Sequence, residues 1–254
     1  RAVETLQNVQ LIAAEDTRHS KKLLLHYKIG TPTISYFEHN RFTRIPKIIK
    51  TLNSGSDVAV ITDAGTPGIS DPGAALVSGA VASGIRVVPL PGPSALSTAL
   101  SVTGWAFTRF LFLGFLPRKR NERVTSLNGV VDEPGPIVIY ESPHRVKATL
   151  TDIHKVFPDR QLVICRELTK LYEEIFRGTA SGAALHFAEP RGEFVILIPG
   201  IGERPEEAVS DDCIAESLRD LSSQGLKGRS LVDRAVELTG APKNRVYRLS
   251  LNSD

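Results

Sequence analysis

Short apolar runs without polar alternation constrain the fold of this chain most strongly. They lie at Leu11–Ala14, Val58–Ile61 and Val87–Leu90, and a segment with a helical pattern follows each of them. Strands of this kind are buried on both faces, as in a parallel sheet that is covered by helices. The alternation therefore predicts an open, mainly parallel α/β sheet, with ligands bound beyond the carboxyl ends of its strands.

Helices are expected between these strands. The predicted ranges are Arg18–Tyr27, Ile45–Leu52, Asp71–Ser83 and Ser94–Val102. Asp71 and Pro72 form a favourable helix start, because aspartate is a good N-cap and proline is tolerated at the first helical position.

A second α/β unit is predicted after a strand at Phe110–Phe115. The basic segment Leu116–Arg123 reads as a break and a candidate hinge between the two units. Strands are expected at Ile137–Tyr140, Leu162–Cys165, Glu174–Arg177 and Phe194–Ile198, with helices such as His144–Val156 and Ala180–Phe187. The turn-rich composition of residues 199–207 predicts a linker, and the pattern from Asp211 onward predicts helices. The predicted organisation is residues 1–115, an N-terminal α/β domain; 116–200, a second α/β domain; and 201–254, a helical extension.

Net charge, cysteine content and the length of the apolar runs limit the compartment and the partners that can be expected for this chain. The formal net charge of +3 permits an anionic partner without proving one. The two cysteines, Cys165 and Cys213, favour a reducing compartment, so a cytoplasmic protein is expected. No apolar run has the length of a membrane span, and no membrane partner is expected. The chain has no methionine and opens with Arg1 in a helix-like segment, so we expect an N-terminal piece to be missing.

The segment Ile61–Gly73, ITDAGTPGISDPG, is the most unusual loop. Gly65 and Gly68 let backbone groups approach a ligand closely, and Pro67 stiffens the loop. Such a loop suits a flat, polar small molecule held by main-chain groups. Asp71 taken alone is better interpreted as a helix cap, but the loop as a whole favours binding.

The segment Pro89–Ala99 repeats this pattern after the next apolar run. Ser94 opens a helix whose first backbone N–H groups suit a carboxylate or a phosphate. Close helix packing through Ala95 and Ala99 accounts for the same residues equally well. Neither loop matches G-x-G-x-x-G or a Walker A loop, so a nicotinamide or P-loop nucleotide site is not expected.

Polar residues also gather at other predicted strand ends. Asp16 and Arg18 follow the first apolar run, at the edge of the sheet where a ligand is expected. A capped helix with a solvated basic face behind it accounts well for His19, Lys21 and Lys22, but less well for Asp16 and Arg18.

In the second unit, Glu141, His144 and Arg145 suit acid–base work or phosphate binding. Arg166 and Lys170 occupy the equivalent position one strand later. The competing interpretation is an internal salt bridge, such as Glu141 with Arg166. The six histidines show no zinc-like spacing and no G-x-S-x-G motif occurs, so neither a metal nor that nucleophile is expected.

The tail from Gly225 to Leu251 predicts two helices around Gly240-Ala241-Pro242. Its basic residues outnumber its acidic ones. A helix-turn-helix element that contacts nucleic-acid phosphates and a dimerising or capping helical pair are equally compatible with this pattern.

Several segments occur in a characteristic order: EDTRHS, DAGTPGISDPG, PLPGPSA, FLGFLPRK, YESPHR, RELTKLYEE and RGEF. In this respect the chain resembles the ribosomal RNA small-subunit methyltransferase I family, which belongs to the tetrapyrrole-methylase-like, class III methyltransferases. The resemblance runs from about Arg1 to Ile198, and the tail resembles the family's C-terminal extension. One departure is that the family's opening strand and TPIGNL-like loop are missing here, which leaves one wall of the substrate site undefined.

This resemblance implies two α/β domains with the ligand cleft between them, S-adenosylmethionine as methyl donor, and a homodimer. It implies that the acceptor is a cytidine ribose 2′-hydroxyl in the decoding region of 16S RNA, as free RNA or in the assembled 30S particle. A small-molecule, tetrapyrrole-type methylase and a non-catalytic RNA-binding protein with a vestigial cleft remain the alternatives.

The resemblance also assigns residues. Those expected to bind the donor are Asp63, Ala64, Gly65, Thr66, Pro67, Ile69, Asp71, Ser94, Ala95, Tyr140, Leu168 and Thr169. The candidate bases, which the sequence does not rank, are Glu141, Asp16 and His144. Those expected to contact RNA phosphates are Arg18, Arg145, Lys170, Arg118 and Lys119.

Overall fold

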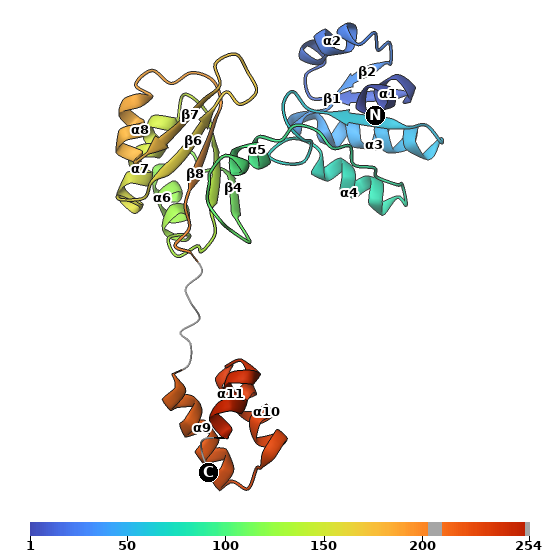
Figure 1. Ribbon diagram of the computed structural model, residues 1–254. Coiled ribbons are helices and arrows are strands. Elements are labelled where there is room, and N and C mark those ends of the chain that lie inside the picture. Colours follow the sequence, from blue (N-terminus) through green and yellow to red (C-terminus); the bar gives the residue numbers. More distant parts are fainter. Residues whose placement is uncertain (203–209, 252–254) are drawn as a thin grey trace. The chain divides into compact units, whose positions relative to one another are not determined.

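The computed structural model describes residues 1–202 and 210–251. By its internal contacts the chain divides into two units. The first comprises Arg1–Val131 and Pro136–Pro199, and the second comprises Asp132–Gly135 and Gly200–Asp254. The first unit contains two separate sheets, each covered by helices (Figure 1). The division of this unit into two domains at 115/116 stays a prediction.

The N-terminal sheet has three parallel strands in the order β2-β1-β3. These strands are β1, Leu11–Ala14; β2, Thr33–Ser35; and β3, Val58–Ile61. The helices around it are α1, Ala2–Asn8; α2, Thr17–His26; α3, Arg41–Asn53, preceded by a short 3₁₀ turn; and α4, Ala74–Ala82. The strands β1 and β3 match their predicted bounds, whereas the short strand β2 was not predicted.

Alternate residues of β1 enter two different cores. Ile12 and Ala14 pack with Leu24 of α2 on one face, and α1 contributes to the same cluster. Ala13 packs with Ile48 of α3 and Leu76 of α4 on the other face. Burial of both faces explains why this strand carries no polar alternation.

The second sheet has five strands in the order β4-β5-β8-β6-β7. They are β4, Leu111–Phe115; β5, Ile137–Glu141; β6, Leu162–Arg166; β7, Glu174–Gly178; and β8, Phe194–Ile198. Of its pairings only β4 with β5 is parallel, and the others are antiparallel. The parallel arrangement predicted for the first sheet is confirmed, whereas the second sheet, for which only an α/β unit was predicted, is mostly antiparallel. The β6–β7 loop, residues 167–173, is shorter than the crossover of about a dozen residues that a parallel pair needs.

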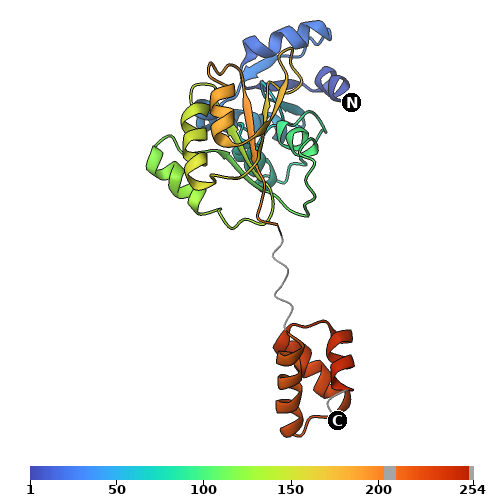
Figure 2. The same cartoon turned by 60° about the vertical axis from the view of Figure 1, so that its left-hand side comes forward.

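Helices cover both faces of this second sheet (Figures 1 and 2). One face is covered by α6, Arg120–Asn128; α7, Val146–Val156; and α8, Ala180–His186. Leu127 and Leu150 belong to the core on that face, together with Ile139 of β5. The helix α5, Ala95–Ser101, packs through Ala99 on the opposite face, against Val138 of β5.

Three local predictions are wrong. Val87–Leu90 forms no strand, because no described strand pairs with it, and Val87 is 44% exposed. The helix α6 begins at Arg120, inside the segment predicted as a break. The helix α4 begins at Ala74 with Gly73 as its N-cap, so Asp71 is not the cap. A Cβ at Gly73 would lie 2.9 Å from the backbone nitrogen of Gly68, so the chain before the helix packs closely against the loop.

The second unit, described by itself, contains three helices among its described residues. They are α9, Asp211–Ser223; α10, Gly228–Thr239; and α11, Lys243–Ser250. They pack around Leu218, Val232 and Val246. Gly240 ends α10 in the left-handed conformation, with φ of 68°, which confirms the predicted turn between the last two helices. Across the described residues, each helix is too short or too polar to cross a bilayer.

Candidate functional site

The loop after β3 presents backbone donors without partners. The amides of Ala64, Gly65 and Thr66 donate to no other described residue. Gly65 and Gly68 have φ of 71° and 86°, values that favour glycine. The Thr66 hydroxyl donates to the carbonyl oxygen of Pro93 at 3.2 Å, which ties this loop to the segment before α5. The loop can therefore hold a polar ligand through consecutive N–H groups.

Carboxylates gather beside this loop. The Asp63 amide donates to the Glu15 carboxylate at 3.2 Å, and the Asp63 carboxylate accepts from the Asp16 amide at 3.3 Å. Burial raises the pKa of Asp71 to about 6, and the nearby charges of Glu15, Glu193 and Asp63 add to this shift. These four residues, Asp71, Glu15, Asp63 and Glu193, are called the acidic cluster below. Glu193 already pairs with Lys170, so the repulsion among Asp71, Glu15 and Asp63 is what favours a further cation at this place.

The side chains of Asp16 and Arg18 form an ion pair with two hydrogen bonds. Asp16 caps α2 by accepting from the Arg18 amide at 2.8 Å, and the Arg18 guanidinium contacts both of its carboxylate oxygens, at 3.1 and 2.8 Å. These hydrogen bonds hold the pKa of Asp16 well below its usual range. A carboxylate with such a low pKa is a weak proton acceptor, so the geometry favours a capping role.

Three residues expected at the donor site come together from different elements. Ala95 of α5, Tyr140 of β5 and Leu168 of the β6–β7 loop pack against one apolar cluster on the sheet. Leu96 of α5 packs against the same cluster as Tyr140, and burial raises the pKa of Tyr140. Ser94 is the N-cap residue of α5, and its side chain accepts no capping hydrogen bond.

Glu141 is buried, and both oxygens of its carboxylate accept hydrogen bonds. It is 1% exposed, and its carboxylate accepts from the Ser142 amide at 2.9 Å and from the Thr149 hydroxyl at 2.6 Å. Its ion pair is with Arg145 at 3.4 Å, and Arg166 instead pairs with Glu174. This geometry favours Glu141 as an anchor for neighbouring groups.

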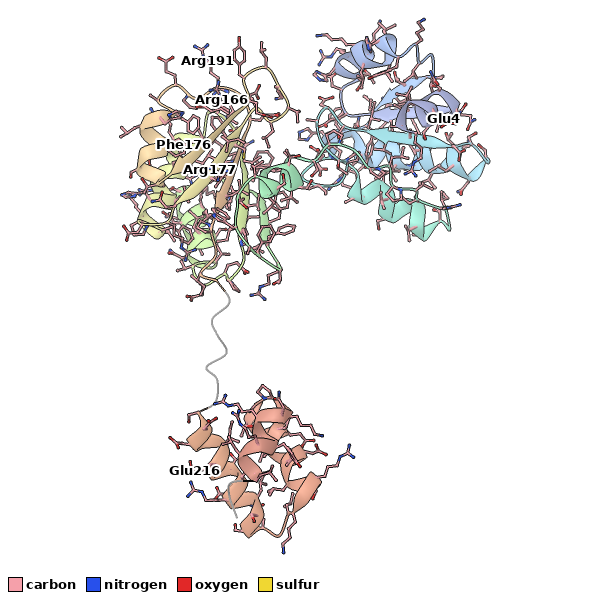
Figure 3. The ribbon with its side chains drawn as sticks, viewed as in Figure 1. Glu4, Arg166, Phe176, Arg177, Arg191 and Glu216 are labelled. Atoms are coloured by element: carbon pink, nitrogen blue, oxygen red, sulfur yellow. The ribbon has the colours of Figure 1, made fainter. Side chains whose placement is uncertain are left out.

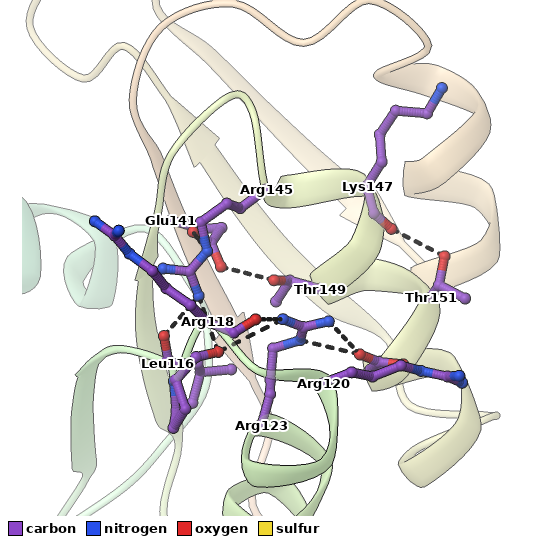
Figure 4. Close-up of polar contacts among 11 residues, drawn as sticks. Leu116, Arg118, Arg120, Arg123, Glu141, Arg145, Lys147, Thr149 and Thr151 are labelled. Atoms are coloured by element: carbon purple, nitrogen blue, oxygen red, sulfur yellow. Dashed lines mark hydrogen bonds and ion pairs between the residues drawn. The ribbon is translucent and has the colours of Figure 1, made fainter.

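Arginines hold the backbone after β4 (Figure 4). Arg145 donates to the carbonyl oxygens of Leu116 at 2.6 Å and Pro117 at 3.2 Å. Arg123 donates to the carbonyl oxygen of Arg118 at 3.2 Å and forms an ion pair with the buried Asp152 at 2.6 Å. Since these donors come from α6 and from the N-cap of α7, the segment 116–118 is fixed between two elements.

A pocket of about 660 Å³ lies beside this segment. Its walls include Phe115, Pro117, Arg118, Ser142, His144 and Arg145. Three of the predicted catalytic or RNA-contacting residues therefore meet at one place: Arg118, His144 and Arg145. Lys119 instead forms an ion pair with Glu122 at 3.1 Å. Sequence reasoning missed Phe115, whose only signal was its place directly before the basic segment.

The charged side chains of the β6–β7 loop form ion pairs and hydrogen bonds within the protein. The Lys170 ammonium lies 2.8 Å from the Glu167 carboxylate and 2.9 Å from that of Glu193. The Thr169 amide donates to the Glu173 carboxylate at 2.6 Å. Arg166, labelled in Figure 3, pairs with Glu174 of the adjacent strand. Lys170 is therefore already neutralised, which weakens its case as a phosphate contact.

Among the residues that the structure describes, no three or more His, Cys, Asp or Glu side chains are arranged so that they could hold a metal ion.

Comparison with known proteins identifies a family to which this chain is similar. Residues 1–184 match the family described as Tetrapyrrole (Corrin/Porphyrin) Methylases. Among solved structures, a uroporphyrin-III C-methyltransferase from Thermus thermophilus, complexed with S-adenosyl homocysteine, has a TM-score of 0.54 at 16% identity, covering 80% of this chain and 89% of that one. A diphthine synthase has a TM-score of 0.59 at 10% identity, with coverages of 78% and 82%. These two likenesses show a shared fold.

Curated relatives are much more similar. The Ribosomal RNA small subunit methyltransferase I of Synechocystis sp. is 44% identical and aligns with 99% of this chain and 91% of its own length. The protein of the same name from Pseudomonas aeruginosa is 43% identical, with coverages of 99% and 90%. With its two helix-covered sheets and the glycine-rich loop after β3, the chain belongs to the ribosomal RNA small subunit methyltransferase I family of the tetrapyrrole methylases.

Proposed function

We propose that this protein uses S-adenosylmethionine to methylate the 2′-hydroxyl of a cytidine ribose in the decoding region of small-subunit ribosomal RNA. The observation that carries the proposal is the loop after β3, where free backbone amides lie next to the acidic cluster. The proposed setting is a cytoplasmic homodimer acting on ribosomal RNA or on the 30S particle.

The residues of this loop fit the donor chemically. The free amides of Ala64, Gly65 and Thr66 suit the polar atoms of its methionine or adenosine parts. The carboxylates of the acidic cluster suit the positive sulfonium, because opposite charges stabilise each other in a partly buried site. Ser94, Ala95, Tyr140, Leu168 and Thr169 are proposed to complete this site. The donor supplies the methyl group, and the protein aligns it with the ribose hydroxyl.

His144 is the best-supported proton acceptor of the candidate bases. It lies at the rim of the pocket, and its ring forms no hydrogen bond or ion pair with another described residue. Glu141 has its carboxylate engaged by the Ser142 amide and the Thr149 hydroxyl, and Asp16 is held by Arg18. In this proposal an imidazole nitrogen of His144 takes the ribose hydroxyl proton, and Glu141 orients Arg145.

Calorimetric titration with S-adenosylmethionine and with S-adenosylhomocysteine tests the donor site. A bulky side chain on the exposed loop, in Ala64→Trp, should weaken both about tenfold or more, because it covers the free amides. The matched control is Ala82→Trp, at the exposed end of α4.

Methylation is then measured on 30S particles with labelled donor, and the modified ribose is located by its resistance to alkaline hydrolysis. Absence of donor binding by the wild-type protein contradicts the proposed function. Methyl transfer to a corrinoid but not to RNA would instead identify a small-molecule enzyme.

A further inference from the structure

We propose that the pocket beside Leu116–Arg118 receives one unstacked base of the RNA, from a nucleotide next to the one that is methylated. This inference rests on the proposed function and adds to it a place where the substrate is recognised.

The walls of the pocket have the chemistry of a base-binding site. Phe115 is 53% exposed, so its ring is open to a stacking partner, and Pro117 extends the apolar wall. The volume of about 660 Å³ is in the range of small-ligand sites. Proteins that read unpaired RNA stack its bases on aromatic side chains of this kind.

The rim of the pocket carries positive and polar groups. The Arg118 guanidinium and the His144 ring have no hydrogen-bonding partner among the described residues. The charge of Arg145 is partly offset by Glu141 at 3.4 Å. A free guanidinium beside an exposed aromatic ring matches a nucleotide, whose base is flat and whose phosphate is anionic. This charge complementarity favours RNA as the occupant.

The pocket is held in shape before any ligand binds. The carbonyl oxygens of Leu116 and Arg118 accept from Arg145 at 2.6 Å and from Arg123 at 3.2 Å. Asp152, which is 1% exposed, holds Arg123 in turn at 2.6 Å. A wall that is already ordered loses little entropy when it binds a base.

The pocket also adjoins the proposed donor site. The ring centroids of Phe115 and Tyr140 lie 5.8 Å apart, and Tyr140 packs against the same apolar cluster as Leu96 at the start of α5. A Cβ at Gly114, the residue before Phe115, would lie 3.1 Å from the Ser70 hydroxyl in the loop after β3. A nucleotide held against Phe115 is therefore close enough to the donor loop to position its neighbour.

Steady-state methylation of 30S particles by Phe115→Leu tests the inference. We expect KM for the particle to rise about 5- to 150-fold, the range for loss of one stacked base. The affinity for S-adenosylmethionine should stay within about twofold, because no donor-loop residue changes. Phe115→Trp should retain the wild-type KM, since it keeps a stacking surface. Phe42→Leu is the control, because Phe42 lies on α3 and is 77% exposed.

A second variant tests the same pocket in case Phe115→Leu folds poorly. Arg118→Gln should lower the dependence of log KM on log salt by about one unit, whereas Lys47→Gln, on the exposed side of α3, should not. Ultraviolet cross-linking of bound particles should attach RNA to the peptide that contains Phe115.

The possible failures are distinguishable. A wild-type protein that neither binds the donor nor methylates RNA overturns the proposed function, and this inference with it. An active wild-type protein whose Phe115→Leu variant behaves like Phe42→Leu, with cross-links elsewhere, overturns the pocket alone.

Discussion

Asp71 is a half-buried carboxyl surrounded by other carboxyls, and its pKa of about 6 has consequences for stability. The folded state binds the Asp71 proton more tightly than the unfolded chain does. Asp71 therefore costs no stability at low pH, and its cost grows as pH rises from about 4 to about 6. We expect Asp71→Asn to be more stable than the wild type at pH 8 and equally stable at pH 4. Urea unfolding at the two pH values measures this difference, and an equal stability at pH 8 would contradict the raised pKa.

The same carboxyl should make donor binding depend on pH. S-adenosylmethionine carries a positive sulfonium, whereas its product, S-adenosylhomocysteine, does not. As pH rises through about 6 and Asp71 ionises, the preference for the donor over the product should grow, by roughly tenfold. Calorimetry from pH 5 to 8 measures both affinities, and Asp71→Asn is the matched control in which the preference should stay flat. A pH-independent preference in the wild type would exclude Asp71 from sulfonium recognition.

Glu141 provides a separate test at this scale. Because its carboxylate holds the Thr149 hydroxyl and Arg145 inside the protein, Glu141→Ala should lower the free energy of unfolding by roughly 2–4 kcal/mol. Glu141→Gln keeps an oxygen acceptor and should lose less. Denaturant unfolding separates this from a role as general base, in which Glu141→Ala would keep its stability and lose only the methylation rate.

Among the elements, α4 begins beside a close backbone approach that the sequence does not reveal. Asp71 and Pro72 carry a good cap signal, yet the helix begins only at Ala74. A Cβ at Gly73 would lie 2.9 Å from the backbone nitrogen of Gly68, so Gly73→Ala should cost roughly 1–3 kcal/mol of stability and disturb the donor loop. Thermal unfolding measures this cost. Gly30→Ala, in open space and outside the left-handed region, is the control and should change stability little.

The strands and helices of the first unit could be predicted largely from sequence because most of their signals are local. The runs at Leu11–Ala14 and Phe194–Ile198 gave strands with their predicted bounds. Val87–Leu90 has the same local pattern and forms no strand, since a strand also requires a partner that composition does not reveal. The antiparallel pairing of β6, β7 and β8 is likewise a matter of topology, which the apolar runs do not encode.

The site residues were harder to predict than the fold. The glycine-rich loop was recognisable, because closely spaced glycines and prolines directly after a buried strand are typical of a loop that binds through its backbone. The roles of Glu141 and Lys170 depend on which partner each side chain meets, Arg145 in the first case and Glu167 with Glu193 in the second. The order of residues along the chain does not specify such pairings.

At the scale of the whole molecule, the helical unit balances its own charges. Asp233 pairs with Arg229 and Lys243, and Asp211 pairs with Arg245. Much of the basic character of the tail is therefore neutralised internally. A contact between this unit and nucleic-acid phosphates stays a prediction.

The donor loop, β1, β3 and α5 all lie in the first unit. A chain that ends after Gly202 should therefore fold and bind S-adenosylmethionine within about twofold of the full-length affinity. Circular dichroism and calorimetry on this shortened chain, beside the full chain, measure both properties. A shortened chain that folds but has lost donor binding would show that the helical unit takes part in the donor site.

The two thiols of the protein differ in a way that makes one of them a natural reporter. Cys165 is buried in the second sheet and its pKa is raised to about 11, whereas Cys213 is exposed on α9. Because the thiolate is the reactive form, a maleimide dye at neutral pH should couple to Cys213 and leave Cys165 unmodified. Trp105, the single tryptophan, lies in the first unit. Energy transfer from Trp105 to a dye on Cys213 would follow the helical unit during the catalytic cycle without any engineered residue.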